Sequence, residues 1–165
     1  SLSNIYYGKI VKHFPFKQID SLLRKISLRK ENKYCEEMDK KYGNYVHSQS
    51  SFTCEGASGM ERMKELMSML RTDTPKVIGG LKVLSFSDYI ASETVDFATG
   101  EKTEITLPKS DVLAFNLENG ASVIIRPSGT EPKIKAYYTT IGETQEAATK
   151  LRDIIADDFK NILGF

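Results

Sequence analysis

A β-hairpin between residues 113 and 126 most strongly limits what this chain can fold into. Alternating hydrophobic residues from Leu113 to Leu117 are followed by Asn119-Gly120, and a second alternating run extends from Ser122 to Arg126. Alternation with a period of two predicts strands with one buried face, and Asn-Gly is typical of the two-residue type I′ turn. The sheet of this protein is therefore expected to contain antiparallel strands that are neighbours in sequence.

Segments with helical periodicity lie on both sides of this hairpin, and together with it they indicate the fold class. Ser58-Gly59-Met60-Glu61 matches a capping box, with Ser58 at the N-cap, and the helix is expected to extend to Arg71. Strands are predicted for residues 81–89 and 133–140, and a final helix for the region after Thr144. The expected buried stripes comprise Met60, Met63, Met67 and Leu70 in the first helix and Ala147, Leu151, Ile154, Ile155, Phe159 and Ile162 in the second. Together these elements predict a two-layer α+β domain, with a roughly four-stranded, mostly antiparallel sheet packed against two helices.

Other segments carry weaker patterns. Residues 46–53 are polar and indicate a linker with one short strand, and residues 90–111 contain a turn at Thr99-Gly100 within a possible small hairpin. Helical spacing over residues 17–28, and again up to Tyr42, predicts a short helical N-terminal segment. We therefore expect residues 1–45 to be a remnant of, or linker from, a preceding domain, and residues 46–165 to form the main domain.

Composition narrows the functional classes. The 165 residues include no apolar run long enough for a membrane span and no signal peptide, so we expect no membrane association and a cytoplasmic location. Two cysteines and two histidines, widely spaced, predict neither a disulfide framework nor a metal site. Residues 1–50 hold 10 Lys/Arg against 5 Asp/Glu, which leaves nucleic-acid binding open as an alternative.

The run from Arg126 to Lys135, RPSGTEPKIK, is the strongest functional signal. It connects two predicted strands, and it gathers a guanidinium, two hydroxyls, a glycine and two ammonium groups. Arg offers a planar fork of donors, hydroxyls add further donors, and Gly129 allows backbone amides to approach an anion. A solvated β-turn that happens to be basic is the simpler interpretation, but the donor set favours a phosphate.

This run closely resembles the phosphate-binding loop of the α-D-phosphohexomutases, the family of phosphoglucomutase and phosphomannomutase. The likeness extends from about Tyr42 to the end, and it includes residues 52–59, Asp88-Tyr89 and residues 107–113. The loop belongs to the last of the family's four domains, whose architecture is the two-layer arrangement predicted above. The resemblance implies that the chain is the C-terminal part of an enzyme interconverting hexose 1-phosphate and hexose 6-phosphate.

The same resemblance assigns roles in this sequence. Arg126 is expected to bind the substrate phosphate with two donors, Ser128 and Thr130 to donate hydroxyls, and Gly129 to contribute backbone amides. Lys135 stands where relatives often have another basic ligand, and as a lysine it would act as a point charge. Lys133 is a weaker candidate on the same strand face.

Other parts of such an enzyme have no counterpart in this sequence. No serine nucleophile loop, no Asp-Gly-Asp metal loop and no Gly-Glu-x-Ser sugar loop occurs. We therefore expect no catalytic and no metal residue in this chain, with Mg²⁺, the catalytic serine and the remaining domains supplied by the rest of the parent mutase. The expected partners are a hexose phosphate and those domains. The alternative is a free-standing binding module on the same fold, with nucleic acid as one candidate ligand.

Overall fold

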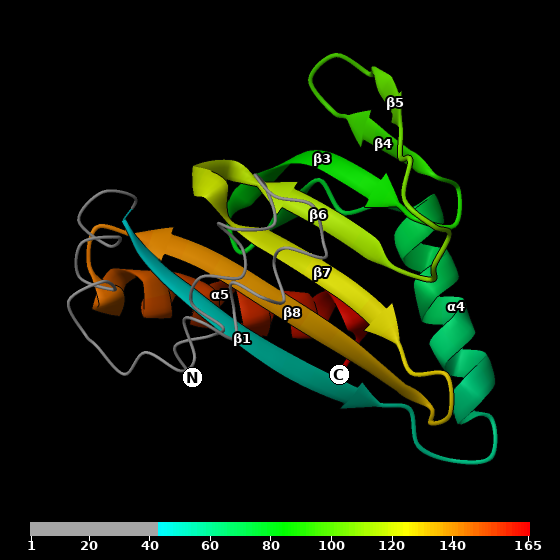
Figure 1. Cartoon of the computed structure of the whole chain (residues 1–165). Helices are drawn as coiled ribbons and strands as arrows, with labels where there is room; N and C mark the ends of the chain where they lie inside the picture. The colour runs from blue at the N-terminus through cyan, green and yellow to red at the C-terminus, as the bar shows by residue number, and fades with distance from the viewer. Residues whose placement is uncertain (1–42) are drawn as a thin grey trace, which may run out of the picture.

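An antiparallel sheet of eight strands dominates residues 43–165, the part of the chain that the computed structural model describes (Figure 1). The spatial order is β1-β8-β7-β6-β3-β4-β5, and β2 pairs with β3. In chain order the elements are β1 (Asn44–Thr53), α4 (Gly59–Thr72), β2 (Val77–Ile78), β3 (Leu81–Asp88), β4 (Glu93–Asp96), β5 (Lys102–Glu104), β6 (Leu113–Leu117), η1 (Glu118–Gly120), β7 (Ser122–Pro127), β8 (Lys133–Gly142) and α5 (Gln145–Leu163). The α+β class with two helices is confirmed, but the sheet has eight strands rather than about four. The helices predicted before Gly43 lie outside the described residues.

The predicted hairpin forms β6 and β7. Asn119 (φ 58°, ψ 24°) and Gly120 (φ 69°) both have the left-handed backbone that a type I′ turn requires. The turn closes with the Ala121 amide donating to the Glu118 carbonyl oxygen at 3.2 Å. The turn predicted at Thr99-Gly100 is confirmed as well, between β4 and β5.

β1 takes the place of the polar linker that the sequence predicts for residues 46–53. It pairs with β8 along all ten of its residues and without a register shift. Val46 and Phe52 are buried, so the alternation of a strand places Ser48 and Ser50 on the same inward side. These two serines interrupt the hydrophobic alternation, and for that reason the sequence predicts only a short strand here.

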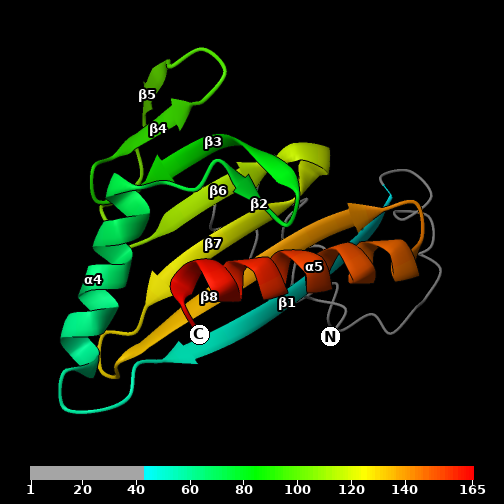
Figure 2. The same ribbon diagram turned by 180° about the vertical axis from the view of Figure 1, so that it is seen from behind.

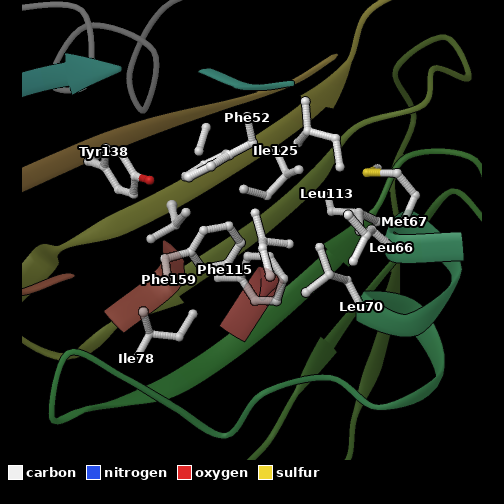
Figure 3. Close-up of a cluster of buried hydrophobic side chains, with 14 of the residues drawn as sticks. Phe52, Leu66, Met67, Leu70, Ile78, Leu113, Phe115, Ile125, Tyr138 and Phe159 are labelled. Carbon is white, nitrogen blue, oxygen red and sulfur yellow. The ribbon is translucent and has the colours of Figure 1, made fainter. Parts of the chain in front are cut away.

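Both helices cover the same face of the sheet (Figure 2). α5 lies along β8 and β1, and its Phe159 ring packs against Phe115 of β6 with ring centroids 6.1 Å apart. The core between the layers is shown in Figure 3, and its fully buried large side chains are Tyr138, Phe115, Phe159, Met67, Leu70, Ile78, Leu113, Leu117, Ile125, Ile134 and Ile155. Burial of this apolar surface is the main stabilising contribution to the fold.

The opposite side of the sheet, which we call the open face, carries the side chains that alternate with the core residues. Neither described helix packs against it (Figures 1 and 2). On the four strands from β1 to β6 its residues are Tyr45, His47, Gln49, Ser51, Thr53, Lys133, Lys135, Tyr137, Thr139, Ile141, Ser122, Ile124, Arg126, Ala114 and Asn116. This face is therefore mainly polar, with Tyr137 and Ile124 as its large apolar members near β7.

α4 begins without the predicted capping box. Ser58 occupies the N-cap position, but its side chain forms no capping hydrogen bond, and its backbone (φ −92°, ψ 10°) is not the extended one that capping needs. Of the predicted stripe, Met63, Met67 and Leu70 are buried, whereas Met60 is 38% exposed. The expectation of a Ser58–Glu61 capping box was therefore wrong.

Arg71 fixes the other end of α4 to the sheet. Its Nε donates to Asp88 Oδ2 at 3.0 Å, and its Nη2 donates to Asp111 Oδ1 at 2.5 Å. Burial disfavours the charge of Arg71, but the two carboxylates more than offset this and raise its pKa. α4 thus lies across one end of the strands, from the β7–β8 loop to the end of β3 (Figure 2).

α5 begins where the sequence predicts, with Thr144 accepting from the Ala147 amide at 3.0 Å. Its buried stripe is Ala148, Ile155, Phe159 and Leu163, whereas the predicted members Ala147 and Ile154 are exposed. The hydroxyl of Thr140 in β8 donates to the Ala148 carbonyl oxygen at 2.6 Å, and this bond fixes how α5 is rotated about its own axis. In the part of the chain that is described, neither helix is long and apolar enough to cross a membrane.

Candidate functional site

Arg126 and Lys135 are brought side by side by the pairing of β7 with β8. Their Cα atoms are direct partners in the antiparallel register, so their Cβ atoms lie roughly 5 Å apart on the open face. Arg126 is exposed and Lys135 is half-buried. The two cationic residues, which are nine positions apart in the sequence, therefore stand at the same level of the sheet.

Neither of these cations has an acidic partner among residues 43–165. The ion pairs in this region involve other side chains, and Lys133, the weaker candidate, is one of them: its Nζ lies 3.1 Å from Glu131 Oε2. Like charges directly opposite each other destabilise a sheet. An anion held between Arg126 and Lys135 would remove this repulsion, so the pair is suited to binding one.

Ser51 extends this pair into a row of three. It lies opposite Lys135 in β1 and is exposed on the same face. We call Arg126, Lys135 and Ser51 the anion row. The sequence did not single out Ser51, because the pattern of residues 46–53 predicts a linker there and therefore no pairing of Ser51 with Lys135.

The loop after Arg126 is organised by Ser128. The Ser128 amide donates to the Lys133 carbonyl oxygen at 2.8 Å, which closes the loop. Its Oγ accepts from the amides of Thr130 (3.4 Å) and Glu131 (3.3 Å). These contacts leave the hydroxyl proton of Ser128 available as a donor, while two amides of the loop are turned toward Ser128 rather than outward.

Gly129 and Thr130 form the exposed tip of the loop. A Cβ placed on Gly129 would meet no atom within 4 Å, and this glycine does not have a positive φ. Neither backbone strain nor crowding within the described residues therefore requires glycine at this position. Its lack of a side chain leaves open the space that an anion would need beside the backbone.

The loop is held against the start of α4. The Cys54 amide donates to the Pro132 carbonyl oxygen at 2.7 Å. Gly59, the first residue of α4, is so close that an added Cβ would collide with the Cys54 carbonyl oxygen and lie 2.9 Å from Pro132 Cβ. The buried free thiol of Cys54 lies in the same junction. The loop thus rests on a closely packed support.

The structure also contains a shallow hollow of about 460 Å³ beside the β4–β5 hairpin. Its lining includes Glu93, Lys102, Glu104 and Lys109, and Lys102 is already paired with Glu93 at 3.0 Å. None of the five predicted site residues contributes to it. The convergence of donors, rather than this hollow, defines the candidate site.

The fold is an α+β domain in which donor groups converge at one end of β7 and β8, and comparison with known proteins identifies its family. The family described as "Phosphoglucomutase/phosphomannomutase, C-terminal domain" matches residues 56–158. The chain belongs to this family of C-terminal domains, and the resemblance inferred from the sequence is confirmed.

Two relatives with similar sequences agree with this assignment. The chain is 35% identical to a probable phosphomannomutase of Haemophilus influenzae over 141 residues, which is 83% of this chain and 26% of that protein. It is 34% identical to a phosphoglucomutase of Staphylococcus epidermidis over 121 residues, which is 73% of this chain and 22% of that protein. Among solved structures, the open form of pp63/parafusin, a phosphoglucomutase from Paramecium, is similar over 88% of this chain and 25% of its own, with 18% identity and a TM-score of 0.49. The chain spans about a quarter of the length of the curated relatives it matches.

Proposed function

We propose that this chain binds the phosphate group of a hexose phosphate, as the substrate-phosphate-binding domain of a phosphohexomutase. The parent enzyme would interconvert hexose 1-phosphate and hexose 6-phosphate. The observation that carries this proposal is the Arg126–Lys135 pair, two directly opposed cations without a carboxylate partner among residues 43–165. The names of the relatives supply the class of substrate.

Each site residue has a part in the proposal. Arg126 binds two oxygens of the phosphate through its guanidinium fork. Lys135 adds a second positive charge from the neighbouring strand, and Ser128 and Thr130 donate hydroxyls from the loop. The Gly129 backbone supplies the surface over which the anion approaches. Because both isomers of the substrate carry a phosphate monoester, one site of this kind serves both.

The domain would contribute binding and orientation rather than chemistry. Holding the phosphate that is not transferred positions the other end of the sugar for reaction. Mg²⁺ and the phosphoryl-carrying serine are proposed to belong to the rest of the parent enzyme, where the metal would neutralise developing charge. Residues 43–165 bring together no cluster of three His, Cys, Asp or Glu side chains that could hold a metal ion.

The nucleic-acid alternative is not favoured. The family match accounts for residues 56–158, and the basic excess that suggested nucleic acid falls in residues 1–50. If the chain bound DNA, its affinity would fall steeply with increasing salt concentration, with a slope set by the number of phosphates that the protein neutralises.

Calorimetric titration of the purified chain with inorganic phosphate tests the proposal. We expect a dissociation constant of roughly 1 mM, since one loop on an open surface competes poorly with water. Arg126→Ala should abolish binding, and a coupled assay with Mg²⁺ should detect no glucose 1-phosphate turnover by the chain alone. Equal phosphate binding by Arg126→Ala would overturn the site, and turnover by the chain would overturn its role as a binding domain only.

A further inference from the structure

The open face continues beyond the anion row in a way that suits the rest of a sugar phosphate. One pleat repeat from Lys135, about 7 Å along β8, stands Tyr137. Ile124 of β7 lies directly opposite Tyr137 on one side, and Gln49 of β1 lies opposite it on the other. This second row, Ile124–Tyr137–Gln49, runs parallel to the anion row across the same three strands.

The second row exposes apolar surface through Ile124. Ile124 is one of the few large hydrophobic side chains left exposed, at 38%. Tyr137 is half-buried and Gln49 is exposed. Among the described residues, neither the Tyr137 hydroxyl nor the Gln49 amide forms a hydrogen bond with another side chain. Within the described part of the chain, an apolar floor with an adjacent amide that has no side-chain partner therefore borders two cations without a carboxylate partner.

We propose that Tyr137 and Gln49 form a subsite for the sugar ring, next to the phosphate held by the anion row. This inference rests on the proposed function, because the phosphate fixes which end of the ligand lies on Arg126 and Lys135. A pyranose presents patches of polarised C–H groups, which the negative face of an aromatic ring attracts. Its hydroxyls need both donors and acceptors, and a glutamine amide supplies both.

The arrangement of strands keeps the two subsites in register. β1, β8 and β7 pair without a register shift through both rows, so a ring attached to the bound phosphate by an ester oxygen meets the second row without any rearrangement of the backbone. Stacking on Tyr137 requires only a patch of C–H groups, so it tolerates the ring whether the bound phosphate is attached at carbon 1 or at carbon 6. Ile124 widens this floor on the side of β7.

A pair of ligands with equal charge separates the two subsites. Methyl phosphate and glucose 6-phosphate are both phosphate monoesters, and they differ in the ring. The full chain is titrated with each ligand by NMR, at one pH and one ionic strength. We expect glucose 6-phosphate to bind several-fold more tightly than methyl phosphate. Tyr137→Ala should lower the affinity for glucose 6-phosphate about fivefold, which matches the free energy of one aromatic contact. The affinity for methyl phosphate should change by less than about twofold.

Three further variants complete the test. Tyr137→Phe should retain the wild-type preference, because it keeps the stacking face. Ile154→Ala removes an exposed apolar side chain of α5, which covers the opposite face of the sheet, and it should leave both affinities unchanged. Gln49→Ala, at an exposed position of β1, should weaken only glucose 6-phosphate binding, and it decides the question if Tyr137→Ala does not fold.

The failures of the two proposals are distinct. If the wild-type chain binds both ligands with equal affinity, or if neither Tyr137→Ala nor Gln49→Ala reduces the preference, the ring subsite is wrong and the phosphate site stands. If the wild-type chain binds neither ligand, the phosphate site is wrong and the ring subsite fails with it.

Discussion

Arg126 and Lys135 face each other across β7 and β8, and neither forms an ion pair with a carboxylate of residues 43–165. In a ligand-free sheet this is an unfavourable pair of neighbours. A side-chain arrangement that lowers stability and concentrates positive charge beside a glycine-containing loop is typical of a binding site.

Removing one of these charges should make the ligand-free protein more stable. We expect Lys135→Gln to raise the free energy of unfolding by about 0.3–1 kcal/mol at low ionic strength, because it relieves the repulsion on Arg126. Urea denaturation measures this change. A lower stability of Lys135→Gln at low salt would contradict the repulsion.

Phosphate should reverse that order of stabilities. With about 10 mM phosphate and a dissociation constant of roughly 1 mM, the wild-type protein gains about 1.4 kcal/mol. Lys135→Gln should gain less, since it binds the anion more weakly. The same denaturation series with and without phosphate checks this result, and sodium chloride at matched ionic strength is the control.

Two glycines near the loop should respond in opposite ways to alanine. Gly59→Ala should destabilise the protein by about 1–3 kcal/mol, because its Cβ would collide with the Cys54 carbonyl oxygen. Gly129→Ala should alter stability by less than about 0.5 kcal/mol, because the space around it is open. It should nevertheless weaken phosphate binding, since the methyl group occupies the approach of the anion. Denaturation and calorimetric titration of both variants measure the two effects. A strongly destabilised Gly129→Ala would show that the loop needs glycine for folding.

The guanidinium fork of Arg126 should matter more than its charge. Arg126→Lys keeps the charge but loses the paired donors, so we expect phosphate affinity to fall at least about tenfold, the value of one charge-assisted hydrogen bond. Calorimetric titration beside Arg126→Ala gives the comparison. Affinity of Arg126→Lys near that of the wild type would mean that the site recognises only charge.

Acid should destabilise the domain through His47. Burial lowers the pKa of His47, and a backbone hydrogen bond with Tyr138 only partly offsets the shift. The unfolded chain therefore takes up a proton at His47 near the ordinary pKa of 6.5, whereas the folded protein takes up this proton only at lower pH. Stability is fully present above that value and falls as the pH drops through it, by at most about 1.4 kcal/mol per pH unit. The fall between about pH 7 and 5 should be smaller in His47→Gln, and an unchanged slope in that variant would assign the effect to other groups.

The sequence predicts those elements whose local signals agree with their tertiary surroundings. The β6–β7 hairpin follows from its alternation and from Asn119-Gly120, which supply both the strands and the turn. The strands that the sequence does not resolve are short or irregular in pattern. β2 has two residues and β5 has three, all three exposed, and β1 has serines at inward positions.

Part of the candidate site can be predicted from the sequence and part cannot. The composition of one loop and its resemblance to a known family predict Arg126, Ser128, Gly129, Thr130 and Lys135, and the structure brings Arg126 beside Lys135. The placement of Ser51, Gln49 and Tyr137 depends on the register of β1 with β8, which pairs residues 80 or more positions apart. Strand register over that separation is set by tertiary packing, so no local pattern predicts it.

The most direct test of the phosphate site is an NMR titration of the chain with glucose 6-phosphate. The backbone amides of residues 126–130 and of Lys135 should shift first and most strongly, because they surround the anion. In Arg126→Ala those shifts should disappear while the signals of the core remain in place. Shifts that begin elsewhere, or that persist unchanged in Arg126→Ala, would contradict the assignment of this loop as the phosphate site.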